Sequence, residues 1–126
     1  MSSLSKIMLV DDQKMANFIN KKLIEITGLA TVVVDYTLPE KALQELENQK
    51  PDLIFLDLNM PVINGWKFLD HLNKKSYQTR VVIVTSSTSE IDKQKARNYT
   101  QVIDFLIKPL TKDTILSLKS KLTLAS

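Results

Sequence analysis

Two kinds of apolar segment alternate along the chain. Five short runs are apolar at almost every position and rich in β-branched residues: 7–10, 31–34, 53–56, 81–84 and 105–107. Runs of this kind are typical of parallel strands that are covered on both faces. Between them lie longer stretches in which apolar side chains recur every three or four positions, which predicts amphipathic helices.

The same spacing predicts which side of each helix faces the core. Between residues 89 and 99 only Ile91, Ala96 and Tyr99 are apolar, so the fourth helix is expected to be the least firmly packed. For the other four helices the expected inward residues are Ala16, Ile19, Leu23 and Ile26; Ala42, Leu43 and Leu46; Phe68, Leu69 and Leu72; and Ile115, Leu118 and Leu122.

Particular residues mark the expected helix ends. Gly28 stands where a C-terminal cap is needed, and Thr37 with Glu40 forms a capping-box pattern for the second helix. Thr111 is expected to cap the last helix. Gly65, which follows an asparagine, is interpreted as a residue needed for turn geometry.

Five strands alternating with five helices predict an α/β fold with a parallel sheet and right-handed crossovers. The 126 residues have the length of one domain, so we expect a single domain over residues 1–126 with its core at about 6–122. In such sheets the ligand site lies at the carboxyl ends of the strands.

The composition excludes several kinds of chemistry. The chain has no cysteine, which excludes disulfides, cysteine-ligated zinc and thiol catalysis, and its single histidine, His71, cannot form a multi-histidine metal cage. The net charge is +3, but the basic residues are scattered, so neither nucleic acid nor membrane is expected as a partner. No apolar run reaches the ~20 residues of a membrane span, and we expect a cytoplasmic protein.

Polar side chains follow four of the five predicted strands. Asp11 and Asp12 follow the first strand, Asp57 the third, Thr85 the fourth and Lys108 the fifth. Each has an ordinary explanation when taken alone: an aspartate pair can cap a helix, and a lysine can be a loop charge. Their common position at one edge of the sheet is what favours a functional site.

The charges of this set favour a divalent cation. Two like charges ~4 Å apart repel by ~4 kcal/mol at an effective dielectric constant of ~20, and here three carboxylates face a single lysine. Carboxylate oxygens favour magnesium, manganese or calcium over zinc. A carboxylate neutralised in this way, beside a lysine and hydroxyl groups, is a credible nucleophile toward a phosphoryl group.

With these residues in these positions, the chain resembles a response-regulator receiver domain over residues 6 to about 122. The features that carry the resemblance are the Asp11-Asp12 pair, LIFLDLNMPVINGWKFL around Asp57, VVIVTSS around Thr85 and DFLIKPL around Lys108. The resemblance implies a flavodoxin-like, doubly wound sheet with strand order 2-1-3-4-5.

The resemblance also implies an acceptor and a cation. Asp57 corresponds to the phosphoacceptor. Magnesium, with manganese as an alternative, would be held by Asp11, Asp12, Asp57 and the backbone carbonyl of Asn59. Asn59 would also border the phosphoryl group.

Further roles follow from the same resemblance. Thr85 and Lys108 would bind phosphoryl oxygens. Ser86, which is small, would leave the phosphoryl site accessible and offer its backbone N–H to the phosphoryl group. Phe105 would act as a switch residue with Thr85, although many family members carry tyrosine at this position. The Lys108-Pro109 peptide bond is expected to be cis.

The function implied is that of a signalling switch, not an enzyme with an external substrate. A histidine kinase or histidine phosphotransfer protein would donate the phosphoryl group, and the domain would catalyse its own phosphorylation and dephosphorylation. A downstream protein would bind the switched surface, and the chain would be a monomer or weak dimer. We expect no output domain within this chain.

Two alternatives have specific features against them. An aspartyl-phosphate phosphohydrolase of the haloacid-dehalogenase type needs a second acidic residue two positions after its nucleophile, where this chain has Asn59. A flavin-nucleotide binder of the flavodoxin type needs hydroxyls and glycine after the first strand, where Asp11 and Asp12 would repel a phosphate.

Overall fold

The computed structural model describes residues 4–75, 77 and 79–125. Five strands and five helices alternate along these residues, as the apolar pattern predicts. Their bounds are β1 (Leu4–Val10), α1 (Lys14–Thr27), β2 (Ala30–Tyr36), α2 (Pro39–Gln49), β3 (Leu53–Leu56), α3 (Gly65–Lys74), β4 (Arg80–Thr85), α4 (Glu90–Ala96), β5 (Val102–Ile107) and α5 (Lys112–Ala125).

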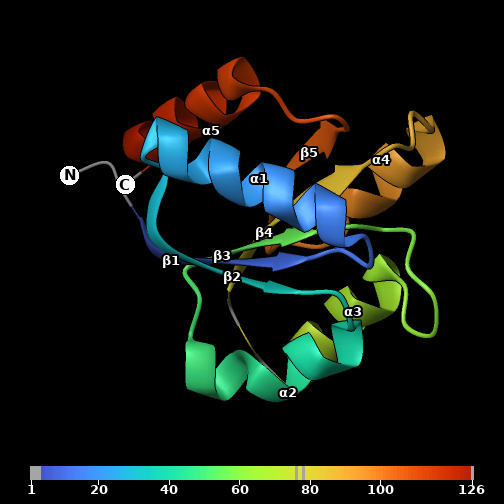
Figure 1. The fold of residues 1–126 in the computed structure, drawn as a ribbon. Coiled ribbons are helices and arrows are strands. Elements are labelled where there is room, and N and C mark those ends of the chain that lie inside the picture. Colours follow the sequence, from blue (N-terminus) through green and yellow to red (C-terminus); the bar gives the residue numbers. More distant parts are fainter. Residues whose placement is uncertain (1–3, 76, 78, 126) are drawn as a thin grey trace.

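All the strands are parallel and form one sheet in the order β2-β1-β3-β4-β5 (Figure 1), which confirms the expected topology. The pairing register aligns the carboxyl ends: Val10 lies beside Tyr36 on one side and Leu56 on the other. Thr85 lies beside Ile107 in the same way. The residues that follow these positions therefore meet at one edge of the sheet.

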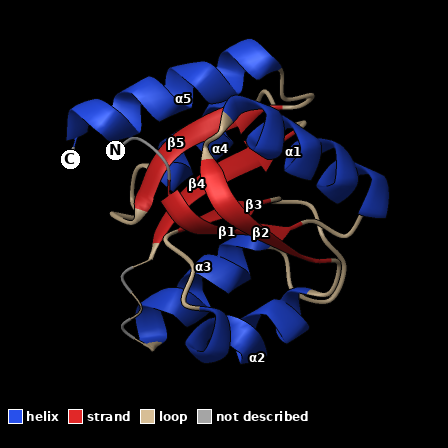
Figure 2. Ribbon diagram, turned by 60° about the vertical axis from the view of Figure 1, so that its left-hand side comes forward, coloured by secondary structure: helices blue, strands red, loops and turns tan. Residues whose placement is uncertain are grey.

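Helices cover both faces of the sheet. Helices α1 and α5 lie on one face, and α2 and α3 lie on the other (Figures 1 and 2). Each face has its own apolar core, to which every inward residue expected for α2, α3 and α5 contributes. The central strand β3 is buried at every position, whereas the edge strands β2 and β5 are partly exposed. Burial on both faces is therefore a property of the central strands alone.

The inward face predicted for α1 is wrong in part: Leu23 packs against the core as expected, but the expected isoleucines do not. The buried residues of this helix are Asn17, Asn20, Ile24 and Thr27. Ile19 is 49% exposed and Ile26 is 65% exposed. The physical reason is that Asn17 makes hydrogen bonds on the inner side, so the helix turns a partly polar stripe toward the sheet and leaves apolar side chains in solvent.

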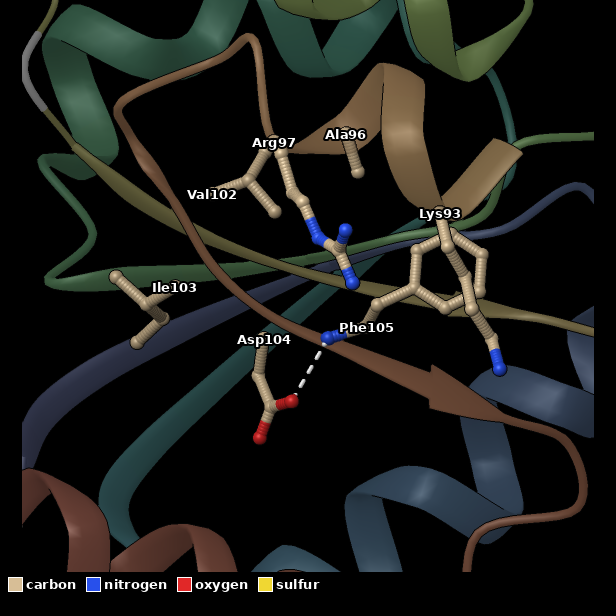
Figure 3. A pocket seen from close by; sticks show the side chains of 7 residues that line it. All are labelled: Lys93, Ala96, Arg97, Val102, Ile103, Asp104 and Phe105. Atoms are coloured by element: carbon tan, nitrogen blue, oxygen red, sulfur yellow. Dashed lines mark hydrogen bonds between the residues drawn. The ribbon is translucent and has the colours of Figure 1, made fainter. Parts of the chain in front are cut away.

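Helix α4 and strand β5 border a groove of about 330 Å³ (Figure 3). Ala96 is buried there, and Phe105 is half-buried against the core below α4. Ile91, which was expected to face inward, is 76% exposed. The seven-residue helix α4 is therefore packed even more lightly than its sequence predicts.

The helix ends agree with the sequence in part. Gly28 caps α1 with φ of 70°, and the Thr111 hydroxyl accepts a hydrogen bond from the backbone N–H of Thr114. The capping box predicted for α2 is wrong: Leu38 is the N-cap residue, with no side-chain hydrogen bond. Pro39, at the first helical position, already has the required φ, so this helix begins without a polar cap.

Candidate functional site

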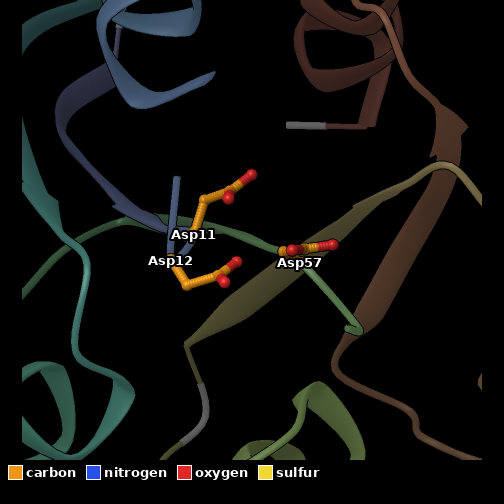
Figure 4. A group of neighbouring side chains, drawn as sticks. All are labelled: Asp11, Asp12 and Asp57. Carbon is orange, nitrogen blue, oxygen red and sulfur yellow. The ribbon is translucent and has the colours of Figure 1, made fainter. Parts of the chain in front are cut away.

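Three carboxylates gather at the carboxyl ends of β1 and β3. Asp11 and Asp12 directly follow β1, and Asp57 directly follows β3 (Figure 4). One carboxylate oxygen from each of these residues lies within 4.8 Å of the others. Asp11 and Asp57 are buried and Asp12 is half-buried. Because β1 and β3 are adjacent and in register, their ends bring these like charges together.

Lys108 reaches this cluster from the end of β5. Its Nζ lies 2.6 Å from Oδ2 of Asp11 and 3.7 Å from Oδ2 of Asp57. Its backbone N–H donates a hydrogen bond of 2.8 Å to the carbonyl of Thr85, which fixes the chain where it leaves the sheet. The Lys108-Pro109 peptide bond is cis, as expected.

Burial raises the pKa of the Asp57 carboxyl from 3.8 to about 6, with a further contribution from the negative charge of Asp11. The ammonium group of Lys108 and the backbone N–H of Asn59 lower the pKa, but each has a smaller effect than burial. The acceptor candidate is thus a carboxylate held in a site that disfavours its negative charge. A cation at the cluster would relieve that cost.

The loop after Asp57 is held by close backbone packing. The Gly65 N–H donates to the carbonyl of Leu58, and the Asn64 side chain caps α3 by accepting from the N–H of Lys67. A Cβ atom on Gly65 would lie 2.6 Å from the backbone oxygen of Asp57. Gly65 is therefore required for the close approach of α3 to the backbone that follows β3, which corrects its interpretation as a turn residue.

One residue of this loop has an unusual backbone. Val62 has φ of 69°, a left-handed conformation that β-branched residues rarely adopt, and its side chain is 83% exposed. The loop therefore holds a strained residue in solvent, a short distance along the chain from Asp57.

The hydroxyl residues that follow β4 occupy different environments. Thr85 is fully buried, and its Oγ1 accepts a hydrogen bond from the backbone N–H of Ser87. The Ser87 hydroxyl donates to Asp92 of α4 at 2.7 Å. Ser86 is exposed. A direct chain of hydrogen bonds therefore runs from the end of β4 to α4.

The remaining candidates lie at different distances from the cluster. Asn59 is exposed, and its backbone N–H points to Oδ1 of Asp57 at 3.4 Å. Phe105 lies within β5 and lines the groove beside Arg97 (Figure 3). The structure thus brings Asp11, Asp12, Asp57 and Lys108 together, while Phe105 lies on the neighbouring α4–β5 surface.

The donor set suits magnesium. Three carboxylates and one ammonium group leave a formal charge of −2, which a divalent cation would neutralise, and hard oxygen donors are the ligands that magnesium prefers. Asp11, Asp12 and Asp57 would hold the ion. It would supply positive charge for phosphoryl oxygens.

One residue of the site is missed by reasoning from the sequence. Asn17 is buried in α1 and its side-chain amide donates to the backbone carbonyl of Asp11. A usable signal does exist in the sequence. Asn17, Asn20, Ile24 and Thr27 follow the same three- and four-residue spacing as the apolar stripe, but polar residues at three of these four positions conceal it.

Comparison with known proteins agrees with this geometry. The family model of the response regulator receiver domain matches residues 7–119. The nitrate/nitrite response regulator protein NarL of Escherichia coli K12 is 41% identical over 86 residues, which are 68% of this chain and 40% of that protein. The chain spans less than half the length of the curated relatives it matches.

Solved structures show the same fold. The crystal structure of a two-component response regulator from Cytophaga hutchinsonii superposes with a TM-score of 0.86 at 27% identity, covering 97% of this chain and 98% of that one. The chemotaxis protein CheY4 of Vibrio cholerae superposes with a TM-score of 0.81 at 24% identity, covering 95% and 99%. Within the part of the chain that the structure describes, no helix is both long enough and apolar enough to cross a membrane.

Proposed function

Because the chain belongs to the response regulator receiver domain family, we propose that Asp57 accepts a phosphoryl group from a histidine kinase or histidine phosphotransfer protein. Receiver domains are signalling switches of two-component systems. The observation that carries the proposal is the buried Asp57 carboxylate, which shares one sheet edge with Asp11, Asp12 and Lys108.

The transfer exchanges one bond to phosphorus for another. A carboxylate oxygen of Asp57 attacks the phosphorus atom of a phosphohistidine, and the P–N bond breaks. The histidine nitrogen leaves with the electron pair and takes up a proton. Lys108, whose ammonium lies 3.7 Å from Asp57, would follow the incoming phosphoryl oxygens and weaken its pairing with Asp11.

Other residues would complete the phosphoryl site. The Thr85 hydroxyl, which accepts from Ser87, still has its own proton to donate to a phosphoryl oxygen. The backbone N–H of Ser86 offers a second donor. Asn59 would supply its backbone carbonyl to magnesium, or manganese, and border the phosphoryl group.

The added group would reset the surface formed by α4 and β5. Phosphorylation adds about −1.5 to −2 of charge beside Thr85 and Lys108. Movement of the Thr85 hydroxyl toward this charge breaks the contact to Ser87 and so disturbs the hydrogen bonds that lead to α4. Phe105 then turns into the space that the Thr85 side chain has left. Because phenylalanine has no hydroxyl, only apolar burial stabilises this inward position.

The exposed apolar side chains of α1 suit a docking phosphodonor. Met15 and Ile19 are 66% and 49% exposed, and they line a groove of about 220 Å³ together with Lys108 and Pro109. A protein seated there would lie beside the acceptor site. Such burial would remove apolar surface from water and stabilise the transfer complex.

Phosphorylation with a small donor tests the proposal. Incubation with acetyl phosphate and magnesium should add one phosphoryl group by intact mass, and Asp57→Asn or chelation should abolish it. Asp35→Asn, at an exposed aspartate of β2, is the matched control and should label normally. Labelling of Asp57→Asn at another residue would overturn the assignment, and repeated turnover of an external phosphate ester would favour the phosphohydrolase.

The remaining parts of the proposal concern the setting. We expect a cytoplasmic receiver that acts as a monomer or weak dimer and passes its signal to a downstream protein through the α4–β5 surface. Profiling of phosphotransfer from purified histidine kinases would identify the donor.

A further inference from the structure

Asn17 joins three parts of the fold next to the acidic cluster. It is 1% exposed and lies in the first half of α1. Its Nδ2 donates to the backbone carbonyl of Asp11 at 3.1 Å and to that of Tyr36 at 3.2 Å. One side chain therefore links the end of β1, the end of β2 and helix α1.

The chemistry of the partners fixes the orientation of this amide. Both partners are carbonyl oxygens, which accept hydrogen bonds but cannot donate them, so Nδ2 must face them. Within the described residues the other end of the amide, Oδ1, is buried and has no hydrogen-bond partner. A buried acceptor without a donor is unfavourable, so the two bonds made by Nδ2 have to outweigh that cost.

These bonds hold the backbone of Asp11 from both sides. The N–H of Asp11 donates to the carbonyl of Tyr36 at 3.1 Å, and Asn17 holds the Asp11 carbonyl. That carbonyl belongs to the peptide unit between Asp11 and Asp12. Fixing the plane of this unit fixes the positions of the Asp12 backbone nitrogen and Cα, from which the Asp12 side chain extends.

We propose that Asn17 is a positioning residue for the cation site, acting through the Asp11–Asp12 peptide unit. The inference rests on the proposed function and adds to it a residue that itself touches neither the cation nor the phosphoryl group. Groups that orient metal ligands from behind typically change metal affinity by ~10–100-fold when they are removed.

The binding measurement uses the full chain without any phosphodonor, and acetyl phosphate is added only to measure labelling. Asn17→Leu keeps the side-chain volume and removes the donor, and Asn17→Ser retains one shorter donor in case the first variant does not fold. Titration with magnesium chloride, followed by calorimetry, should show binding at least ~10-fold weaker for Asn17→Leu and an intermediate loss for Asn17→Ser. At saturating magnesium the labelling rate at Asp57 should recover, because the ligands are misdirected but present.

Thr27→Val is the matched control. Thr27 lies on the same buried face of α1, and its hydroxyl donates to carbonyls of its own helix. This variant should lower the unfolding free energy without changing the affinity for magnesium. Unchanged magnesium affinity in the folded Asn17 variants would overturn the inference alone. Failure of the unmodified chain to bind magnesium at all would overturn the proposed function as well.

Discussion

Lys108 pairs with Asp11 and not primarily with Asp57. The Nζ–Oδ2 distance to Asp11 is 2.6 Å, across a separation of 97 residues in the sequence. The lysine thus occupies part of the space in which a cation would balance the same carboxylates. It stabilises the acidic cluster and also competes with any cation that enters it.

Lys108→Ala and Asp12→Ala should therefore have opposite effects on magnesium binding. Removing the lysine deletes a repelling cation, so the magnesium affinity should hold or rise. Removing Asp12 deletes a negative ligand, so the affinity should fall at least ~10-fold. Calorimetric titration of both variants measures this, and weaker binding by Lys108→Ala would contradict the role assigned to that residue.

Asp57→Asn should stabilise the chain at neutral pH in the presence of a chelator. The folded-state pKa of Asp57 is about 6, above the ordinary 3.8, so between these values the folded protein binds more protons than the unfolded one. The contribution of Asp57 to the free energy of unfolding therefore falls as the pH rises from about 4 to 6, whereas an asparagine at this position does not titrate. The expected difference is roughly 2–3 kcal/mol at pH 7.

Urea denaturation at pH 4 and pH 7 measures this effect. The difference in the free energy of unfolding between Asp57→Asn and the unmodified chain should grow with increasing pH. Magnesium should reduce this difference, because it binds the carboxylate of the folded unmodified chain. Asp35→Asn, at an exposed site, should show no such growth. A difference that is independent of pH would mean that ionisation of Asp57 is not its source.

Gly65→Ala should destabilise the chain by about 2–3 kcal/mol, because the new methyl group would meet the backbone of Asp57 and Leu58 at 2.6–2.8 Å. The shifted loop should also slow labelling by acetyl phosphate. Gly28→Ala is the control: its φ of +70° is strained for alanine, but Lys119 Nζ lies 3.5 Å away and there is room. The free energy of unfolding should fall in both variants, whereas the rate of labelling by acetyl phosphate should fall only in Gly65→Ala.

Val62→Gly should stabilise the chain by about 1 kcal/mol. A left-handed conformation costs a non-glycine residue about 1–3 kcal/mol, and glycine loses roughly 0.5–1 kcal/mol through its greater freedom when unfolded. Val32→Gly, in the extended edge strand β2, removes a valine without relieving strain and should destabilise. Thermal unfolding measures the stability of the two glycine variants. A loss of stability in both would refute the argument that Val62 is strained.

Tyr99→Ala should loosen α4 far more than Tyr99→Phe. The Tyr99 ring stacks on Trp66 of α3 with centroids 5.8 Å apart, and its hydroxyl donates to Asp70 at 2.9 Å. The phenylalanine variant keeps the stacking and loses an exposed hydrogen bond worth about 1 kcal/mol. Hydrogen exchange over residues 90–96 should accelerate strongly only in the alanine variant, and equal acceleration would assign the coupling to the hydroxyl.

The apolar pattern is sufficient for the order of the elements because each central strand must be apolar on both faces. The site candidates at the strand ends followed from the same logic, since parallel strands bring their carboxyl ends to one edge. The inward face of α1 was not predictable in this way. Asn17 is buried because it donates hydrogen bonds to backbone carbonyls, and an apolar pattern does not count a polar residue among those that face inward.

The reason why position 65 requires glycine could not be predicted from the sequence either. Its need for space comes from the backbone of Asp57 and Leu58, which approaches only when α3 packs on the sheet. The exposure of Ile91 depends in the same way on how α4 is seated against its neighbours. Both features depend on how a helix packs against the rest of the fold, and the spacing of apolar residues does not reveal that packing.

The separation between Asp11 and Lys108 also has a consequence during protein synthesis. A ribosome releases the three acidic residues well before the lysine that partly neutralises them, so the nascent chain carries an unbalanced cluster until β5 emerges. The strand that completes the sheet thereby also completes the charge balance. A chain that ends before Lys108 can bring the three carboxylates together but cannot pair any of them with this lysine.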